Sequence, residues 1–98
     1  MFKRILSQMK DKIRRQLYIM TLHAEEEMGE DGLTIYDVES SILTGEILER
    51  QKDRVTSEWK YRIRGRTVSG SKIEVIAKPG PTGKLVIITV YSVKTGGH

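Results

Sequence analysis

Residues 58–68, which read EWKYRIRGRTV, decide how this chain folds. Apolar and basic side chains alternate along the stretch: the apolar ones are Trp59, Tyr61 and Ile63, and the basic ones are Lys60, Arg62, Arg64 and Arg66. Successive side chains of a β-strand point to opposite faces, so a period of two indicates a strand with one buried and one solvated face. We therefore predict a strand whose basic face looks away from the core.

Further strands are expected on both sides of this stretch. Residues 46–51 (EILERQ) and 72–78 (KIEVIAK) alternate in a similar way, and residues 85–93 (LVIITVYSV) are apolar on both faces. The connections SGSK at 69–72 and PGPTGK at 79–84 are rich in residues that form tight turns. Because strands joined by tight turns pair antiparallel, we predict an antiparallel meander.

The first half of the chain has helical periodicity instead. Apolar residues recur every three or four positions over 2–16, which predicts a basic amphipathic helix. Thr21 is the expected N-cap of a second helix that ends at GEDG, residues 29–32. Thr34 and Asp37 have the spacing of a capping box and predict a third helix that ends at Gly45. Residues 18–22, YIMTL, are expected to extend as a short strand between the first two helices.

Helices followed by strands indicate an α+β fold, in which the N-terminal helices pack on one face of a three- to four-stranded antiparallel sheet. The 98 residues suffice for one domain. We expect residues 1–17 to form the basic helix as part of that domain, 18–93 the α+β unit, and 94–98 a flexible tail. The simplest interpretation lays the first helix on the core; a basic arm and a membrane-surface helix are the alternatives.

Charge is distributed unevenly along the chain. Residues 1–17 carry a net +5, residues 18–50 a net −8 and residues 51–98 a net +7, for a total of +4. Two basic ends around an acidic middle suggest faces of opposite sign, one of which attracts polyanions. The chain has no cysteine, which excludes disulfides and thiolate metal sites and fits a reducing compartment. No apolar run approaches the roughly 18 residues of a membrane span, and charges continue through Arg15, so we expect a cytoplasmic protein without membrane contact.

The basic row of residues 60–66 is the most informative feature for function. Alternate residues of a strand stand about 6 to 7 Å apart, close to the phosphate spacing of an extended nucleic-acid strand, on the order of 6 Å. Four cations in line repel each other unless they are solvated or face an anion. A solvated outer face and a polyphosphate-binding face are therefore both open, and Lys78 and Lys72 on the neighbouring strand would widen the patch.

Three other side chains are candidates for chemistry. His23, the only histidine inside the predicted domain, either packs at its helix start or serves as a general acid or base. Thr89 and Tyr91 share one face of the last strand, and they are either core residues or, on the basic face, contacts for a base or a phosphate. His23 has helical spacing to Glu26 and Glu27 but no third ligand, so we expect neither a metal nor another cofactor.

Two motifs resemble a known family. Residues 22–47, LHAEEEMGEDGLTIYDVESSILTGEI, match its opening H-A-x-x-x-M-x-x-x-G-(I/L)-(S/T)-x-x-D-(V/A), and residues 84–91, KLVIITVY, resemble its last strand. The family is domain-of-unknown-function family 4258, and the resemblance covers residues 18–92. It implies a fold similar to RelE-like and BrnT-like toxins and to small microbial ribonucleases.

What the resemblance implies for function is a toxin-type endoribonuclease, or an inactive relative. It would act without a metal ion on free or ribosome-bound RNA and have an antitoxin protein as partner. The family's opening histidine falls on His23, and its closing threonine and tyrosine fall on Thr89 and Tyr91. Many relatives carry arginines where this chain has Glu27 and Asp31, which weakens RNA contact by that helix.

The catalytic residues expected are His23, Arg64 and Tyr91, and the RNA- or phosphate-binding ones are Lys60, Arg62, Arg66, Lys78 and Thr89. The alternatives are a non-catalytic module that binds nucleic acid and an adaptor that binds a partner protein through the acidic half.

Overall fold

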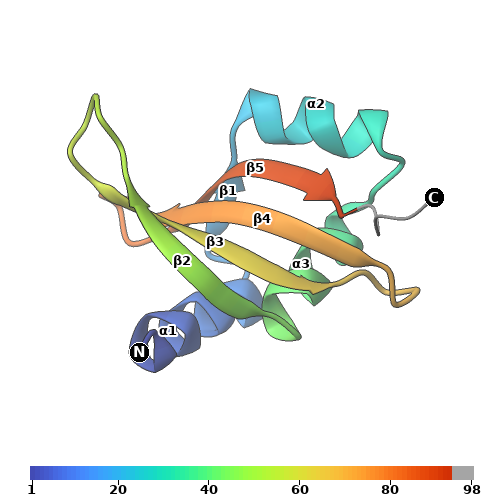
Figure 1. The fold of residues 1–98 in the computed structure, drawn as a ribbon, viewed down its shortest axis with the longest axis horizontal. Helices are drawn as coiled ribbons and strands as arrows, with labels where there is room; N and C mark the ends of the chain where they lie inside the picture. Colours follow the sequence, from blue (N-terminus) through green and yellow to red (C-terminus); the bar gives the residue numbers. More distant parts are fainter. Residues whose placement is uncertain (94–98) are drawn as a thin grey trace.

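The computed structural model describes residues 1–93, so the predicted tail at 94–98 lies outside the described residues. In chain order, its elements are α1 (Lys3–Arg14), β1 (Tyr18–Met20), α2 (Leu22–Glu30), α3 (Ile35–Leu43), β2 (Glu46–Lys52), β3 (Trp59–Arg66), β4 (Lys72–Pro79) and β5 (Leu85–Ser92). Three helices thus precede the main strands, and the predicted α+β class is confirmed (Figure 1).

The sheet has five strands in the order β1-β5-β4-β3-β2, so the prediction of three or four was too low. The prediction of a purely antiparallel sheet was also wrong, because β1 pairs in parallel with β5, with Tyr18 opposite Leu85 and Met20 opposite Ile87. Strand β1 is only three residues long, too short to show an alternation of its own. It is fixed by backbone bonds to the edge of β5, which pattern analysis of one segment does not detect.

Helices α1 and α3 cover one face of the sheet, and no helix of residues 1–93 lies on the opposite face (Figure 1). Buried side chains of α1 and α3 meet the inward side chains of the strands in a single core, whose members are Met9, Ile13, Ala24, Val38, Ile42, Ile63, Ile73, Val75, Ala77, Leu85, Ile87 and Val90. Burial of apolar surface on this one side stabilises the fold. We call the opposite, helix-free side of the sheet the open face.

Helix α2 lies along the outer edge of β5, past the point where β1 ends (Figure 1). The Glu27 carboxylate accepts the backbone N–H of Val90 at 3.0 Å, and the Asp31 carboxylate accepts that of Ser92 at 3.0 Å. An exposed edge strand presents unpaired backbone groups that invite pairing with another chain. These two carboxylates accept hydrogen bonds from backbone N–H groups on the edge of β5. This role explains why acidic residues occupy these positions of the helix.

The predicted helix starts are confirmed. The Thr21 side chain caps α2 by accepting the N–H of Ala24 at 3.1 Å. Thr34 and Asp37 form the capping box of α3. Asp37 also accepts the backbone N–H of Val68 at 3.0 Å, which ties the start of α3 to the β3–β4 turn.

A close approach of backbones fixes α3 against β3. A Cβ atom built on Gly65 would lie 1.8 Å from the carbonyl oxygen of Ser41, and one on Gly45 would lie 2.3 Å from the same atom. Ser41 is fully buried in the last turn of α3. Only glycine at these two positions lets the helix end pack directly on the strand backbone.

Replacing Gly65 by alanine is therefore expected to destabilise the protein by more than about 3 kcal/mol, because the obstacle is backbone and cannot rotate away. Urea unfolding followed by circular dichroism measures the effect. Gly29→Ala is the matched control: it lies in α2 with nothing within 4 Å of the added Cβ. That variant should gain about 0.5 to 1 kcal/mol, and equal stabilities of the two variants would contradict the packing argument.

Candidate nucleic-acid interface on the open sheet face

The open face carries the basic row together with Thr89 and Tyr91. In the register of β4 and β5, Glu74 lies opposite Tyr91 and Ile76 opposite Thr89, whereas buried Val75 lies opposite buried Val90. The register shifts between Ile76 and Ala77, so β5 holds one extra residue there. This bulge resets the alternation of β5, which is why the pattern of that strand alone could not assign its faces.

Glu74 is the centre of a charged cluster that joins three strands. Its side chain is only 3% exposed although it points to the open face. One carboxylate oxygen accepts Arg62 Nη1 at 3.0 Å, and the other accepts Arg64 Nε at 2.8 Å and Nη2 at 2.5 Å. The Tyr91 hydroxyl donates to the first oxygen in a short hydrogen bond. We call these four residues, Arg62, Arg64, Glu74 and Tyr91, the Glu74 cluster.

The cluster extends to the sheet edge through a second carboxylate. Glu49 on β2 accepts Arg62 Nε at 3.1 Å and the side-chain amide of Gln51 at 2.8 Å. The hydrogen bond from Gln51, followed by that from Arg62, lowers the pKa of the Glu49 carboxyl. Two carboxylates therefore hold the Arg62 guanidinium in one orientation, and the fixed fork of donors on a guanidinium matches the geometry of carboxylates and phosphates.

Opposing effects set the ionisation of Glu74. Burial by itself raises the pKa of the carboxyl, but the hydrogen bonds from Tyr91, Arg62 and Arg64 outweigh it and hold the pKa below its ordinary value of 4.5. Burial, and then the hydrogen bond to Glu74, raise the pKa of the Tyr91 phenol above 10.0. At neutral pH the pair is therefore a carboxylate and a protonated hydroxyl.

The predicted row of free cations is thus divided. Arg62 and Arg64 are paired with Glu74, and Lys78 is paired with Glu58 at 2.7 Å. Lys60 and Arg66 form no ion pair with any of residues 1–93. Thr89 lies on the same face, partly exposed, opposite Ile76.

His23 lies apart from this cluster. It stands exposed in the first turn of α2, and its Nε2 is 3.3 Å from the carboxylate of Glu27, which in turn holds the backbone of Val90. Within the described part of the chain, no hydrogen bond or ion pair joins His23 to the Glu74 cluster. The structure brings Arg62, Arg64 and Tyr91 together but leaves the predicted catalytic histidine at the edge of β5.

Glu74 is the residue that sequence reasoning missed. It is the only acidic residue after residue 58 and shares a strand face with Lys78. If strands β3 and β4 are paired through their short connection, Glu74 falls opposite Arg64, as it does in the structure. An isolated carboxylate opposite a basic row was the available signal.

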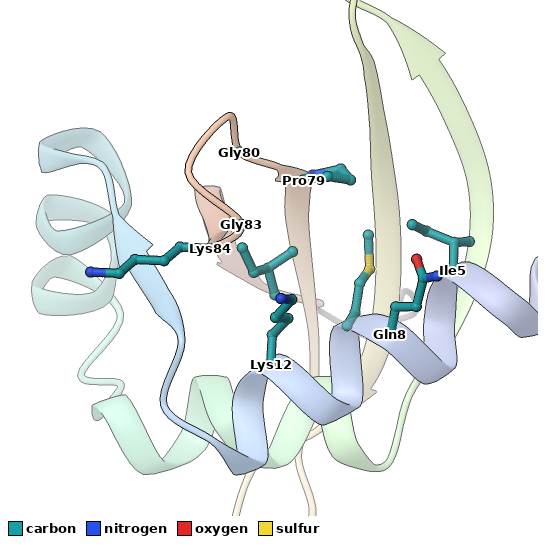
Figure 2. A pocket seen from close by; sticks show the side chains of 9 residues that line it. Ile5, Gln8, Lys12, Pro79, Gly80, Gly83 and Lys84 are labelled. Carbon is teal, nitrogen blue, oxygen red and sulfur yellow. The ribbon is translucent and has the colours of Figure 1, made fainter.

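A pocket of about 100 Å³ lies on the other side of the molecule, between α1 and the β4–β5 turn (Figure 2). Apolar side chains, including Ile5, Met9 and Leu85, line it together with Lys12 and Lys84. In Figure 2 the two lysine side chains point in different directions, so their ammonium groups do not converge on one anion. None of the predicted site residues lines this pocket.

Among residues 1–93, no three His, Asp or Glu side chains are grouped so that they could hold a metal ion. No helix within the same range is long and apolar enough to cross a membrane.

The buried ionised carboxylate makes stability depend on pH. Because its folded-state pKa lies below 4.5, Glu74 contributes stability above about pH 4.5 that is lost as the pH falls through the folded-state pKa. We expect Glu74→Gln to cost about 3 kcal/mol at pH 7 and to flatten the acid side of the stability curve. Urea titrations between pH 7 and pH 3 measure both effects. Glu30→Gln, on the exposed end of α2, should follow the wild-type curve; a Glu74→Gln curve parallel to wild type would disprove the assignment.

Comparison with known proteins agrees with the motifs. No curated protein and no solved structure matches the chain. Residues 20–92 match the family described as "Domain of unknown function (DUF4258)". This range includes strands β2 to β5, the last residue of β1, helices α2 and α3, and the Glu74 cluster. The chain is therefore a member of the DUF4258 family.

Proposed function

We propose that this protein is a toxin-type endoribonuclease that binds single-stranded RNA on the open face and cleaves it without a metal ion. The observation that carries the proposal is Glu74, a carboxylate buried among Arg62, Arg64 and Tyr91 on the side of the sheet without helices. Removing a carboxylate from water is costly even when it is paired. A sheet face that is only solvated needs no such cluster, and ionisable groups with shifted pKa values concentrate at functional sites.

The cluster contains the groups that metal-independent RNA cleavage requires. In this reaction the ribose 2′-oxygen attacks the adjacent phosphorus, the bond from phosphorus to the 5′-oxygen breaks, and a 2′,3′-cyclic phosphate and a 5′-hydroxyl form. Glu74 accepts the 2′-hydroxyl proton, and the Tyr91 hydroxyl gives a proton to the leaving 5′-oxygen. The proton on Glu74 then returns to Tyr91 through their hydrogen bond. Arg62 and Arg64 stabilise the added charge on the phosphate.

Substrate binding also adjusts the base. The pKa of Glu74 is held low by its hydrogen bonds, which makes the free carboxylate a weak base. A phosphate that takes hydrogen bonds from Arg62 and Arg64 competes with Glu74 for them. Loss of these bonds raises the pKa of Glu74 toward the range in which it accepts a proton effectively.

The family resemblance adds the setting of this activity. A toxin-type ribonuclease acts in the cytoplasm, on free or ribosome-bound RNA, and is held inactive by an antitoxin protein. The acidic helices α2 and α3 lie away from the open face (Figure 1), so an antitoxin that blocks RNA binding would have to cover the open face itself.

A second candidate function is a module that binds RNA without cleaving it. It is favoured by the saturation of Glu74, both of whose oxygens already accept hydrogen bonds from two arginines and a tyrosine. In that case Glu74 only fixes the arginines, and Lys60 and Arg66 contribute phosphate contacts.

Incubating the protein with a mixed single-stranded RNA pool in EDTA, with and without ribosomes, tests both functions. We expect discrete cuts, located by end-mapping, and a rate reduced 10²-fold or more in Arg64→Ala and Glu74→Gln. The first variant loses a cation that stabilises the reacting phosphate, and the second loses the group that accepts the 2′-hydroxyl proton. Arg14→Ala, on the exposed side of α1, should cleave like wild type.

The outcomes separate the two candidates. RNA that is bound in a gel shift but stays intact in both arms would support the binding module and rule out the nuclease. RNA that is neither bound nor cut in either arm would exclude both. Circular dichroism of each variant shows whether a loss of activity reflects a loss of fold.

A further inference from the structure

A polar hollow adjoins the Glu74 cluster on the open face. It lies where β2 and β3 meet the end of α3, and the residues that line it include Thr44, Gly45, Glu46, Arg64, Arg66 and Lys72. Three of these side chains are cationic and one is anionic. Arg64 belongs both to the hollow and to the Glu74 cluster, so the two sites are contiguous.

Two cations of the hollow face each other without a counterion. Arg66 on β3 lies directly opposite Lys72 on β4, and both side chains are exposed. Like charges directly opposite on one face of an antiparallel pair are destabilising. The carboxylates of residues 1–93 form no ion pair with either residue, and Arg66 Nη1 donates only to the Gly70 carbonyl at 3.3 Å. Two residues along the same strand pair, by contrast, Arg64 lies opposite Glu74 and is neutralised by it.

The spacing relates the hollow to the reacting phosphate. Arg66 follows Arg64 by two residues on the same strand face, and such residues are about 6 to 7 Å apart. Successive phosphates of an extended RNA strand have a similar separation, on the order of 6 Å. A strand whose scissile phosphate contacts Arg62 and Arg64 therefore brings the neighbouring phosphate over Arg66 and Lys72.

We propose that this hollow is a second phosphate subsite, in which Arg66 and Lys72 bind the phosphate next to the scissile one. The inference rests on the proposed function and deepens it. It makes the substrate class single-stranded RNA with at least two consecutive phosphates, and it assigns Lys72 a role in substrate binding. The hollow has one anionic side chain, Glu46, against three cationic ones. Its net charge is therefore positive, which suits a phosphate and not a cation.

Short non-cleavable oligonucleotides test the subsite by binding alone. The probes are a 2′-deoxy dinucleotide with one internal phosphate, the same dinucleotide with an added 5′-phosphate, and the same with an added 3′-phosphate. Isothermal titration calorimetry at fixed salt gives the three affinities. We expect one of the two terminal phosphates to increase affinity about tenfold in wild type, and the position of that phosphate gives the direction of the strand.

The variants Arg66→Ala and Lys72→Ala should reduce this gain to less than threefold. Lys84→Ala, an exposed lysine on the β4–β5 turn, is the matched control and should keep the tenfold gain. Amide chemical shifts of Gly45 and Gly65, followed in wild type, should move with the favoured probe and less with the dinucleotide that lacks the terminal phosphate.

Three results would overturn the subsite. The first is a tenfold gain in affinity that survives in both variants. The second is no gain from either terminal phosphate in a protein that binds and cleaves RNA. Either result would rule out the subsite and leave the proposed nuclease intact. Failure of wild type to bind any of the probes or the longer RNA removes the proposed function and the subsite with it.

Discussion

One buried carboxylate, that of Glu74, organises the open side of this molecule. Glu74 lies on the middle strand of the sheet and receives hydrogen bonds from Arg62 and Arg64 on one neighbour and from Tyr91 on the other. Without it, two guanidinium groups would stand on one strand face with no anion between them. With it, their side chains are held in fixed directions, and the three strands are cross-linked on the side where no helix packs.

Such a cross-link constrains both stability and function. A buried charge is weak evidence for stability by itself, because its desolvation offsets much of the attraction to its partners. Its arrangement matters more here: the two arginines project from a rigid strand of a five-stranded sheet, and sites on such elements are held more precisely than sites on loops. The hydrogen bonds from Arg62 and Arg64 lower the pKa of Glu74. A phosphate that takes these bonds in place of Glu74 would be held at the same position.

Much of this fold followed from local patterns. The alternation around Ile63 identified the buried and basic faces of β3, and threonines 21 and 34 marked the helix starts, because these features depend on neighbours within a few residues. The parallel strand β1 and the bulge in β5 depend instead on contacts between distant segments. Arg62, Arg64 and Tyr91 were expected in the site, but Glu74 escaped prediction for the same reason: the cluster spans three strands, and their register brings the carboxylate to the arginines.

The two faces of β3 are mechanically coupled at one position. Gly65 lies between Arg64 and Arg66, and because side chains alternate, the residue that touches α3 necessarily directs both neighbours to the open face. The backbone of Gly65 packs against Ser41, and the next amide, that of Arg66, donates to Thr44 at 3.0 Å. The end of α3 therefore fixes this part of β3 from the core side. Since Arg64 must meet Glu74 at hydrogen-bond distance on the opposite side, a shift of α3 by a fraction of an ångström would be transmitted to the Glu74 cluster. The core contact of a residue without a side chain thus determines the geometry of the charged site.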